Sequence, residues 1–271
     1  MNALCVNDLR FAYGRHSVLN GITFGVSAGE MVFVLGKNGA GKSTLFKCLL
    51  GQNKKESGTI EIEGRPIESY KPRSLAKCVA YIPQAGSPTF NYTVRQMVVM
   101  GRTVHLPPFS SPTREDEDIV TDALSRMSIL DLADKGFEEI SGGERQLALI
   151  ARALVQQGTI LLMDEPTSNL DYGNQLRVLK NVKDLTASGI TVLVSSHNPQ
   201  HALLFGDRVI AIDGGTILSA GTPKDVLDAG LVRKLYGVDV EFARCEGETI
   251  ILPRLNGDHE DEIETSSSNP N

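Results

Sequence analysis

One stretch of the sequence has the residue types and the spacing needed to hold a chain of phosphates. Residues 36–43, Gly-Lys-Asn-Gly-Ala-Gly-Lys-Ser, fit the pattern G-x-x-x-x-G-K-[ST]. Glycines let backbone N–H groups wrap around phosphates, Lys42 can meet the terminal phosphates, and Ser43 can hold Mg²⁺. A glycine-rich turn can show the same pattern. Here, however, residues 36–43 lie between the apolar run 31–35 and an amphipathic stretch, and this position predicts phosphate binding.

Two carboxylates follow a second apolar run. Ile-Leu-Leu-Met at 160–163 is typical of a buried strand, and Asp164 and Glu165 come directly after it. Ligands collect at the carboxyl ends of strands in open α/β sheets. Asp164 could therefore hold Mg²⁺ through its water shell, and Glu165 could orient or deprotonate an attacking water. An Asp-Glu-Pro turn is the alternative interpretation.

A third candidate lies at a predicted helix start. Ser141 precedes Gly142 and Gly143, and an apolar helical face follows them. Ser141 alone is best interpreted as an ordinary N-cap. Two bare glycines at a helix N-terminus also admit an anion, so a second phosphate site is the sharper hypothesis.

These stretches lie on a predicted α/β scaffold. Apolar runs at 31–35, 160–163 and 190–194 are typical of strands buried on both faces of a parallel sheet. A helix around residues 176–185 joins the last two runs in a βαβ unit. The sequence therefore predicts a mainly parallel sheet with helices on both faces.

Smaller parts surround the predicted sheet. Three strand-like stretches predict an N-terminal antiparallel β lobe, at 4–10, 18–26 and 59–63. Three helical patterns predict a helical subdomain over about 85–157, at 93–101, 113–127 and 142–157. A helix starting at Thr222 and a hairpin over 238–252 follow. We expect one domain over residues 1–255.

The composition is that of a globular chain of 271 residues, 41% hydrophobic and 22% charged. Much of the net charge of −6 belongs to residues 256–271, which are acidic without any Lys or Arg and are expected to be a disordered tail. The nearly neutral remainder has no electrostatic footprint for nucleic acid.

Four cysteines without a C-x-x-C pair predict reduced thiols. No apolar run reaches the roughly 20 residues of a membrane span, so work at a membrane would need another chain as its anchor.

The three motifs follow one another along the chain as the phosphate loop, the glycine-bearing helix start and the strand-end carboxylates. With them, the sequence resembles the ATP-binding subunits of ABC transporters over residues 1 to about 255. Residues 36–44 match the Walker A motif, 160–165 the Walker B motif, and 140–144 the signature motif. The resemblance implies a P-loop NTPase fold that binds ATP and Mg²⁺ and hydrolyses ATP.

Other family landmarks follow in order. Tyr13 resembles the aromatic residue that stacks on adenine, Gln84 the Q-loop glutamine, Asp171 a D-loop residue, and His197 the switch histidine. Each alone could be an ordinary surface or capping residue. Together they imply nucleotide contacts by Tyr13, Gly36, Asn38, Gly39, Ala40, Gly41, Lys42, Ser43, Thr44, Ser141, Gly142, Gly143 and Asp171. They imply metal ligation by Ser43, Gln84 and Asp164, and catalysis by Glu165, His197 and Gln84.

Two signature residues depart from the family pattern, because Ile140 replaces Leu and Glu144 replaces Gln. The phosphate-contacting residues between them are intact. The resemblance further implies a head-to-tail homodimer in which each ATP lies between one P-loop and the partner's signature helix. It also implies a separate permease, docked near Gln84 and residues 93–102, at the cytoplasmic face of the cell membrane.

Residues 92–102 resemble the corresponding stretch of importers for iron-siderophore, haem and cobalamin. The resemblance implies import of such a metal chelate, with an extracytoplasmic substrate-binding protein acting indirectly. Residues 134–139 depart from the acidic, glycine-bearing segment of exporters, which also favours import. Molybdate or tungstate importers are similar and remain an alternative. A soluble ABC-type ATPase of iron-sulfur cluster assembly is a second alternative, against which residues 93–102 argue.

Overall fold

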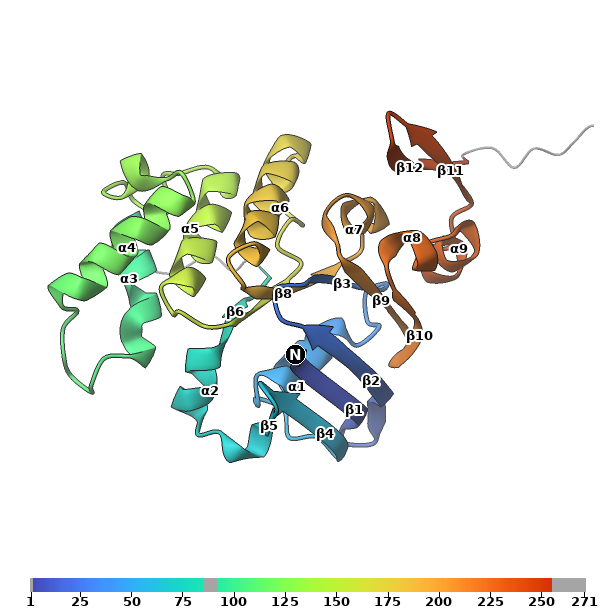
Figure 1. The fold of residues 1–271 in the computed structure, drawn as a ribbon, viewed down its shortest axis with the longest axis horizontal. Coiled ribbons are helices and arrows are strands. Elements are labelled where there is room, and N and C mark those ends of the chain that lie inside the picture. Colours follow the sequence, from blue (N-terminus) through green and yellow to red (C-terminus); the bar gives the residue numbers. More distant parts are fainter. Residues whose placement is uncertain (1, 85–91, 255–271) are drawn as a thin grey trace, which may run out of the picture.

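The computed structural model describes residues 2–84 and 92–254. Its centre is a six-stranded sheet in the order β10-β9-β3-β8-β7-β6 (Figure 1). Neighbouring strands run parallel, except β10, which is antiparallel to β9. These strands are β3 (Met31–Leu35), β6 (Val79–Ile82), β7 (Ile160–Asp164), β8 (Thr191–Ser196), β9 (Arg208–Asp213) and β10 (Thr216–Gly221). The predicted mainly parallel sheet is confirmed.

Strand β3 shows why the sheet needs a layer on each face. Side chains alternate between the two faces of a strand. Met31, Phe33 and Leu35 belong to one buried cluster, together with the helices on that side. Val32 and Val34 belong to a second cluster on the opposite face. An uninterrupted apolar run therefore corresponds to a strand covered on both faces, as the sequence predicts.

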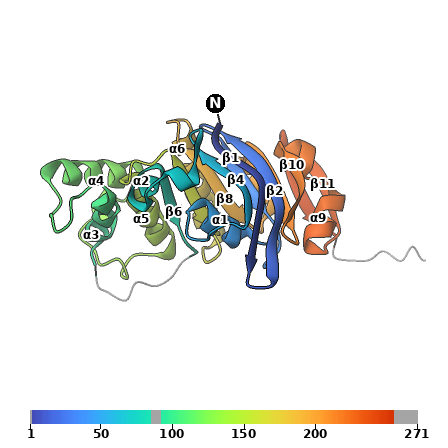
Figure 2. The ribbon, with the colours of Figure 1, turned by 90° about the horizontal axis from the view of Figure 1, so that it is seen from below.

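A four-stranded antiparallel sheet, in the order β2-β1-β4-β5, forms the predicted N-terminal lobe. Its strands are β1 (Asn2–Tyr13), β2 (His16–Ser27), β4 (Ser57–Ile62) and β5 (Arg65–Pro66). Helix α1 (Lys42–Leu49) shares a buried cluster with both sheets through Leu45, Phe46 and Leu49. Figure 2 shows this lobe beside the central sheet. The 3₁₀ helix η1 (Ile67–Ser69) and α2 (Pro72–Cys78) lead from it into β6.

Helices of the other layer pack on one another at the far end of the central sheet (Figure 1). They are α3 (Val94–Val99), η2 (Met100–Val104), α4 (Arg114–Arg126), η3 (Leu130–Leu132) and α5 (Gly142–Leu154). The helix predicted over 93–101 changes to a 3₁₀ turn after Val99, and the one predicted over 142–157 ends three residues early. Gln157 has a φ of +57°, outside the helical region. The predicted subdomain limit at residue 85 and the acidic tail 256–271 lie outside the described residues.

The remaining elements complete the sheet cover and the C-terminal end. They are α6 (Tyr172–Thr186), α7 (Pro199–Phe205), α8 (Pro223–Val226), α9 (Ala229–Tyr236), β11 (Val240–Cys245) and β12 (Glu248–Pro253). One side chain of α7 bonds twice to the β11–β12 hairpin: the Gln200 amide donates to Thr249 O (3.0 Å) and accepts from Ile251 N (2.9 Å). Within the described ranges, no helix is long and apolar enough to cross a bilayer.

Candidate functional site

The loop at residues 36–44, here called the P-loop, joins β3 to α1. A Cβ atom on Gly36 would lie 2.4 Å from the carbonyl oxygen of Ile212, so no larger residue fits. Gly39 and Gly41 have φ values of +81° and +105°, which favour glycine. Gly41 is the N-cap of α1 and no side chain caps this end. The first backbone N–H groups of α1 are therefore free to receive an anion.

Lys42 is buried beneath the P-loop. Its Nζ donates to the carbonyl oxygens of Gly36 (2.7 Å) and Lys37 (3.2 Å), and it lies 3.5 Å from Glu165 Oε1. Burial lowers the pKa of Lys42, and the carboxylates of Glu165 and Asp164 partly oppose that shift. A phosphate placed here would supply further negative charge and favour the ammonium form.

One serine hydroxyl holds both strand-end acids. Ser195 Oγ donates to Asp164 Oδ1 at 2.5 Å and accepts from the backbone N–H of Glu165 at 2.9 Å. Asp164 and Ser195 are opposite each other in the parallel β7–β8 register, and both are buried. Glu165 has a φ of +48°, a left-handed conformation that costs a non-glycine residue energy. Local geometry thus turns Glu165 out of the strand while Asp164 stays in it.

Three of the predicted site residues converge on Glu165. Gln84 Nε2 lies 3.4 Å from Glu165 Oε2, His197 Nδ1 lies 3.7 Å from the same oxygen, and Lys42 Nζ is next to the other oxygen. Gln84 follows β6, Glu165 follows β7, and His197 follows β8. Because the carboxyl ends of parallel strands share one edge, residues more than a hundred positions apart meet here.

A cavity of about 300 Å³ lies between the P-loop and this cluster. It is lined by Val18, Asn38, Gly39, Gly41, Lys42, Ser43, Thr44, Gln84 and Glu165. Ser43, Gln84 and the nearby Asp164 provide hydroxyl, amide and carboxylate oxygens, the donors that Mg²⁺ prefers. No cluster of three His, Cys, Asp or Glu suited to a metal occurs among the described residues. A metal here would therefore depend on these mixed oxygen donors together with phosphate.

Within the described residues, Ser141, Gly142 and Gly143 of the signature motif are not part of the cavity lining. Ser141 caps α5, because its Oγ accepts from Glu144 N (3.3 Å) while Glu144 Oε2 accepts from Ser141 N (2.7 Å). These bonds hold the pKa of Glu144 below its usual value. The departure from Gln to Glu at this position is thus compatible with a complete capping box. Gly143 packs so closely on Asn174 that a Cβ would lie 2.4 Å from its Oδ1.

Four other predicted nucleotide contacts also lie outside the cavity lining within the described ranges: Gly36 and Ala40 in the P-loop itself, and Asp171 and Tyr13 elsewhere. Asp171 caps α6 by accepting from Asn174 N at 2.9 Å, as its capping interpretation predicts. Tyr13 is half-exposed at the end of β1, packs edge-on against Phe11, and accepts from Asn53 Nδ2 at 3.0 Å. The Tyr13 ring is therefore accessible to a flat ligand.

Comparison with known proteins places this geometry in a family. The sequence pattern of the family described as "ABC transporter" matches residues 19–168. This chain belongs to the ABC transporter family. It is therefore an ABC-type ATPase with the P-loop fold of that family.

Individual ABC proteins match over most of their length. An uncharacterized ABC transporter ATP-binding protein of Haemophilus influenzae is 39% identical, over 87% of this chain and 89% of its own. The hemin import ATP-binding protein HmuV of Rhodococcus jostii is 34% identical, over 89% and 82%. A solved ABC transporter structure described as metal-chelate type, in an inward-facing conformation, gives a TM-score of 0.82 at 30% identity, over 94% and 97%.

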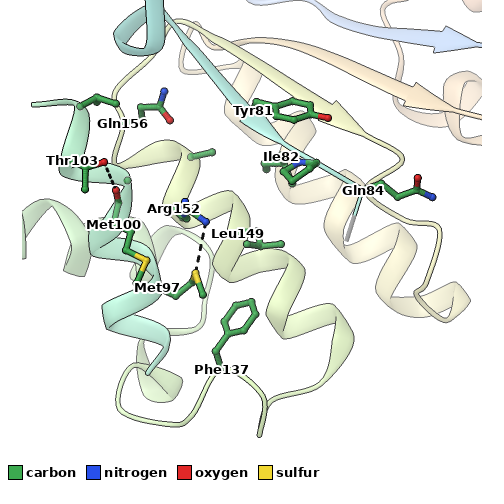
Figure 3. Close-up of a pocket in the computed structure, with 14 residues that line it drawn as sticks. Tyr81, Ile82, Gln84, Met97, Met100, Thr103, Phe137, Leu149, Arg152 and Gln156 are labelled. Atoms are coloured by element: carbon green, nitrogen blue, oxygen red, sulfur yellow. Dashed lines mark hydrogen bonds between the residues drawn. The ribbon is translucent and has the colours of Figure 1, made fainter. Parts of the chain in front are cut away.

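A second hollow of this ABC subunit lies on the other side of Gln84. It measures about 730 Å³ and runs between β6, α3, η2 and α5 (Figure 3). Its apolar lining includes Met97, Met100, Phe137 and Leu149. We call it the docking groove, after the role proposed for it below. Gln84 lines both this groove and the P-loop cavity.

Sequence reasoning missed two residues around Asp164. Ser195 was not singled out, although its place at the end of the predicted strand 190–194 was a usable signal. Tyr81, in the unpredicted strand β6, lies beside Asp164 as well. Burial, followed by the Asp164 carboxylate, raises the pKa of Tyr81 to about 12. Asp164 thus lies between two hydroxyl groups contributed by neighbouring strands.

Proposed function

We propose that this chain powers the import of a metal chelate through a separate membrane permease. The observation that carries the ATPase site is the convergence of Lys42, Gln84 and His197 on Glu165 at the rim of the P-loop cavity. The proposal of import is supported by similarity to a hemin import subunit and to a metal-chelate type transporter. Iron-siderophore, haem and cobalamin are the proposed cargo classes.

The P-loop would bind the phosphates of ATP, with Lys42 meeting the β- and γ-phosphates. Mg²⁺ would be held by Ser43, Gln84 and Asp164. When bound, it would neutralise charge on the β- and γ-phosphate oxygens. The other predicted contacts, Asn38, Ala40 and Thr44 among them, belong to the same loop. Tyr13 would stack on the adenine.

Glu165 would act as the general base on the attacking water. It lies at the cavity edge, and a base must be within hydrogen-bond reach of the proton it takes. Gln84 would orient that water, and His197 would contact the γ-phosphate. His197 is more than half-exposed, so it is accessible to a phosphate arriving in the cavity.

A homodimer would complete each ATP site. Ser141, Gly142 and Gly143 lie at the N-terminus of α5 and outside the chain's own cavity lining within the described residues. A helix N-terminus is a suitable site for phosphate, so these residues would contact the ATP of the partner subunit. Asp171, at the N-terminus of α6, would lie at the same interface.

The docking groove would receive a cytoplasmic segment of the permease. Its apolar residues suit the packing of a helix face, and Gln84 lines both this groove and the P-loop cavity, which supports the proposal. The subunit would then work peripherally at the cytoplasmic face of the membrane. An extracytoplasmic binding protein would act on it only through the permease.

The test is to purify tagged Glu165→Gln from detergent extracts of source-cell membranes with ATP present. We expect this variant to retain ATP, to lose about 10²–10⁴-fold in turnover, and to co-purify with a polytopic membrane protein. Lys42→Ala should lose nucleotide binding, whereas Lys47→Ala, exposed on the same helix, should behave as wild type. Soluble scaffold proteins in place of a permease would contradict the proposal. Unchanged turnover would remove Glu165 from the base role.

Uptake of labelled ferric siderophore, haem, cobalamin or molybdate by the reconstituted complex would then identify the cargo.

A further inference from the structure

The loop between η2 and α4, residues 105–112, presents one aromatic side chain entirely to solvent. Phe109 has the greatest relative exposure among the exposed large hydrophobic residues of the described chain, at 109%. Its φ of +63° lies in the left-handed region, where glycine or asparagine is far better tolerated. Phenylalanine at this position therefore adds no buried surface to the fold and adopts an unfavourable backbone conformation.

The stem of this loop is fixed by a buried ion pair. Arg102 Nε lies 2.7 Å from Asp116 Oδ1, and Arg102 Nη1 donates to Val155 O at 2.8 Å. The other Asp116 oxygen accepts from the Thr113 backbone N–H at 2.8 Å. The two ends of the loop are thereby joined to each other and to the end of α5.

The body of the loop is also held. Arg73 donates to the carbonyl oxygens of Val104 (2.9 Å) and Leu106. The Ser110 hydroxyl donates to Pro107 O at 2.8 Å, and Pro107 and Pro108 restrict the backbone before Phe109. Such a loop has little conformational freedom to lose on binding, which makes Phe109 a preorganised contact.

The loop is continuous with the docking groove. Arg73, Phe109 and the loop residues line a hollow of about 450 Å³ that also includes Thr103 and Val104. Thr103 and Val104 line the docking groove as well (Thr103 is labelled in Figure 3). A partner seated in the groove would therefore reach Phe109 without leaving the surface.

We propose that Phe109 is an anchor that inserts into an apolar pocket on the cytoplasmic surface of the permease, beside the segment that fills the docking groove. This inference rests on the proposed function. An exposed aromatic side chain, held rigidly next to an interface, has the properties of a binding hot spot. Its left-handed backbone conformation is the kind of local strain that clusters at binding sites.

The experiment uses the full-length subunit and the membrane protein that co-purifies with it, placed in lipid nanodiscs. Labelled wild type, Phe109→Ala and Phe109→Asn are titrated against loaded nanodiscs and against empty nanodiscs of the same lipids. Leu252→Ala is the control, because Leu252 is an exposed apolar residue in the distant β11–β12 hairpin. Basal ATPase activity and melting temperature are measured in parallel.

We expect both Phe109 variants to bind loaded nanodiscs about 30-fold more weakly, with basal ATPase and melting temperature retained. Phe109→Leu should recover most of the affinity. Wild-type affinity in Phe109→Ala would overturn this inference and leave the proposed function standing. Equal, Phe109-dependent binding to empty nanodiscs would overturn it in favour of a lipid contact. Failure of the wild type to co-purify with any membrane protein would reject the proposed function and this inference together.

Discussion

Replacing Ser195 by alanine tests whether one hydroxyl positions both acids of the site. Ser195 is fully buried and bonds to the Asp164 carboxylate and to the Glu165 backbone N–H. A hydrogen bond to a charged group contributes about 1.5–3 kcal/mol, and an unsatisfied buried N–H costs ~1–3 kcal/mol. We therefore expect Ser195→Ala to lower the free energy of unfolding by about 3 kcal/mol. Urea denaturation measures this loss.

The same substitution should affect Mg²⁺ use. Removing a group that orients a metal-binding carboxylate weakens metal affinity or activity by about 10–100-fold. We expect the Mg²⁺ concentration for half-maximal ATPase activity to rise within this range in Ser195→Ala. Thr191→Val is the matched control, because Thr191 is buried at the other end of β8, away from Asp164, and its hydroxyl accepts from Gly29 N at 3.1 Å. A loss of stability with unchanged Mg²⁺ dependence would refute the positioning role and leave Ser195 a packing residue.

Two further predictions concern acid stability and the C-terminal hairpin. The Thr113 backbone N–H, and then Arg102, lower the Asp116 pKa from 3.8 to about 2. Because the folded-state pKa is depressed, this stabilisation is complete above about pH 4 and is lost as the pH falls through 2. The unfolding free-energy difference between wild type and Asp116→Asn should shrink by about 2 kcal/mol over that interval in denaturant titrations, and a constant difference would contradict it. Gln200→Ala should speed hydrogen exchange at the Ile251 amide, measured by mass spectrometry. Unchanged protection would show that the hairpin holds itself.

Strands buried on both faces could be predicted because their composition is distinctive. The runs that became β3 and β7 are uninterrupted apolar stretches, and the run that became β8 is interrupted by Thr191 alone; such runs are typical of strands covered on both sides. Strand β6 has four residues directly after α2 and lacks such a signal. Its position depends on pairing with β7, a contact between residues about eighty positions apart. Sequence-local reasoning does not contain that information.

The candidate site divides in the same way. The P-loop could be predicted from its spacing, because the glycines at 36, 39 and 41 are required by close contact or by positive φ. Ser195 has no motif of its own. Its role depends on parallel register, which places it opposite Asp164. A sequence reader who paired the ends of the predicted strands could have found it.

Gln84 gives a physical reason for permease docking and hydrolysis to be coupled in the proposed function. Its amide is 3.4 Å from Glu165, and the same residue lines the docking groove. Filling the groove would restrict the segment that carries Gln84, while a phosphate in the cavity would compete for the charges around Glu165 and Lys42. Each event would therefore change the free energy of the other, and such coupling is reciprocal by thermodynamic necessity. A permease that favours the ATP-bound state must, in the same measure, bind the ATP-loaded subunit more tightly.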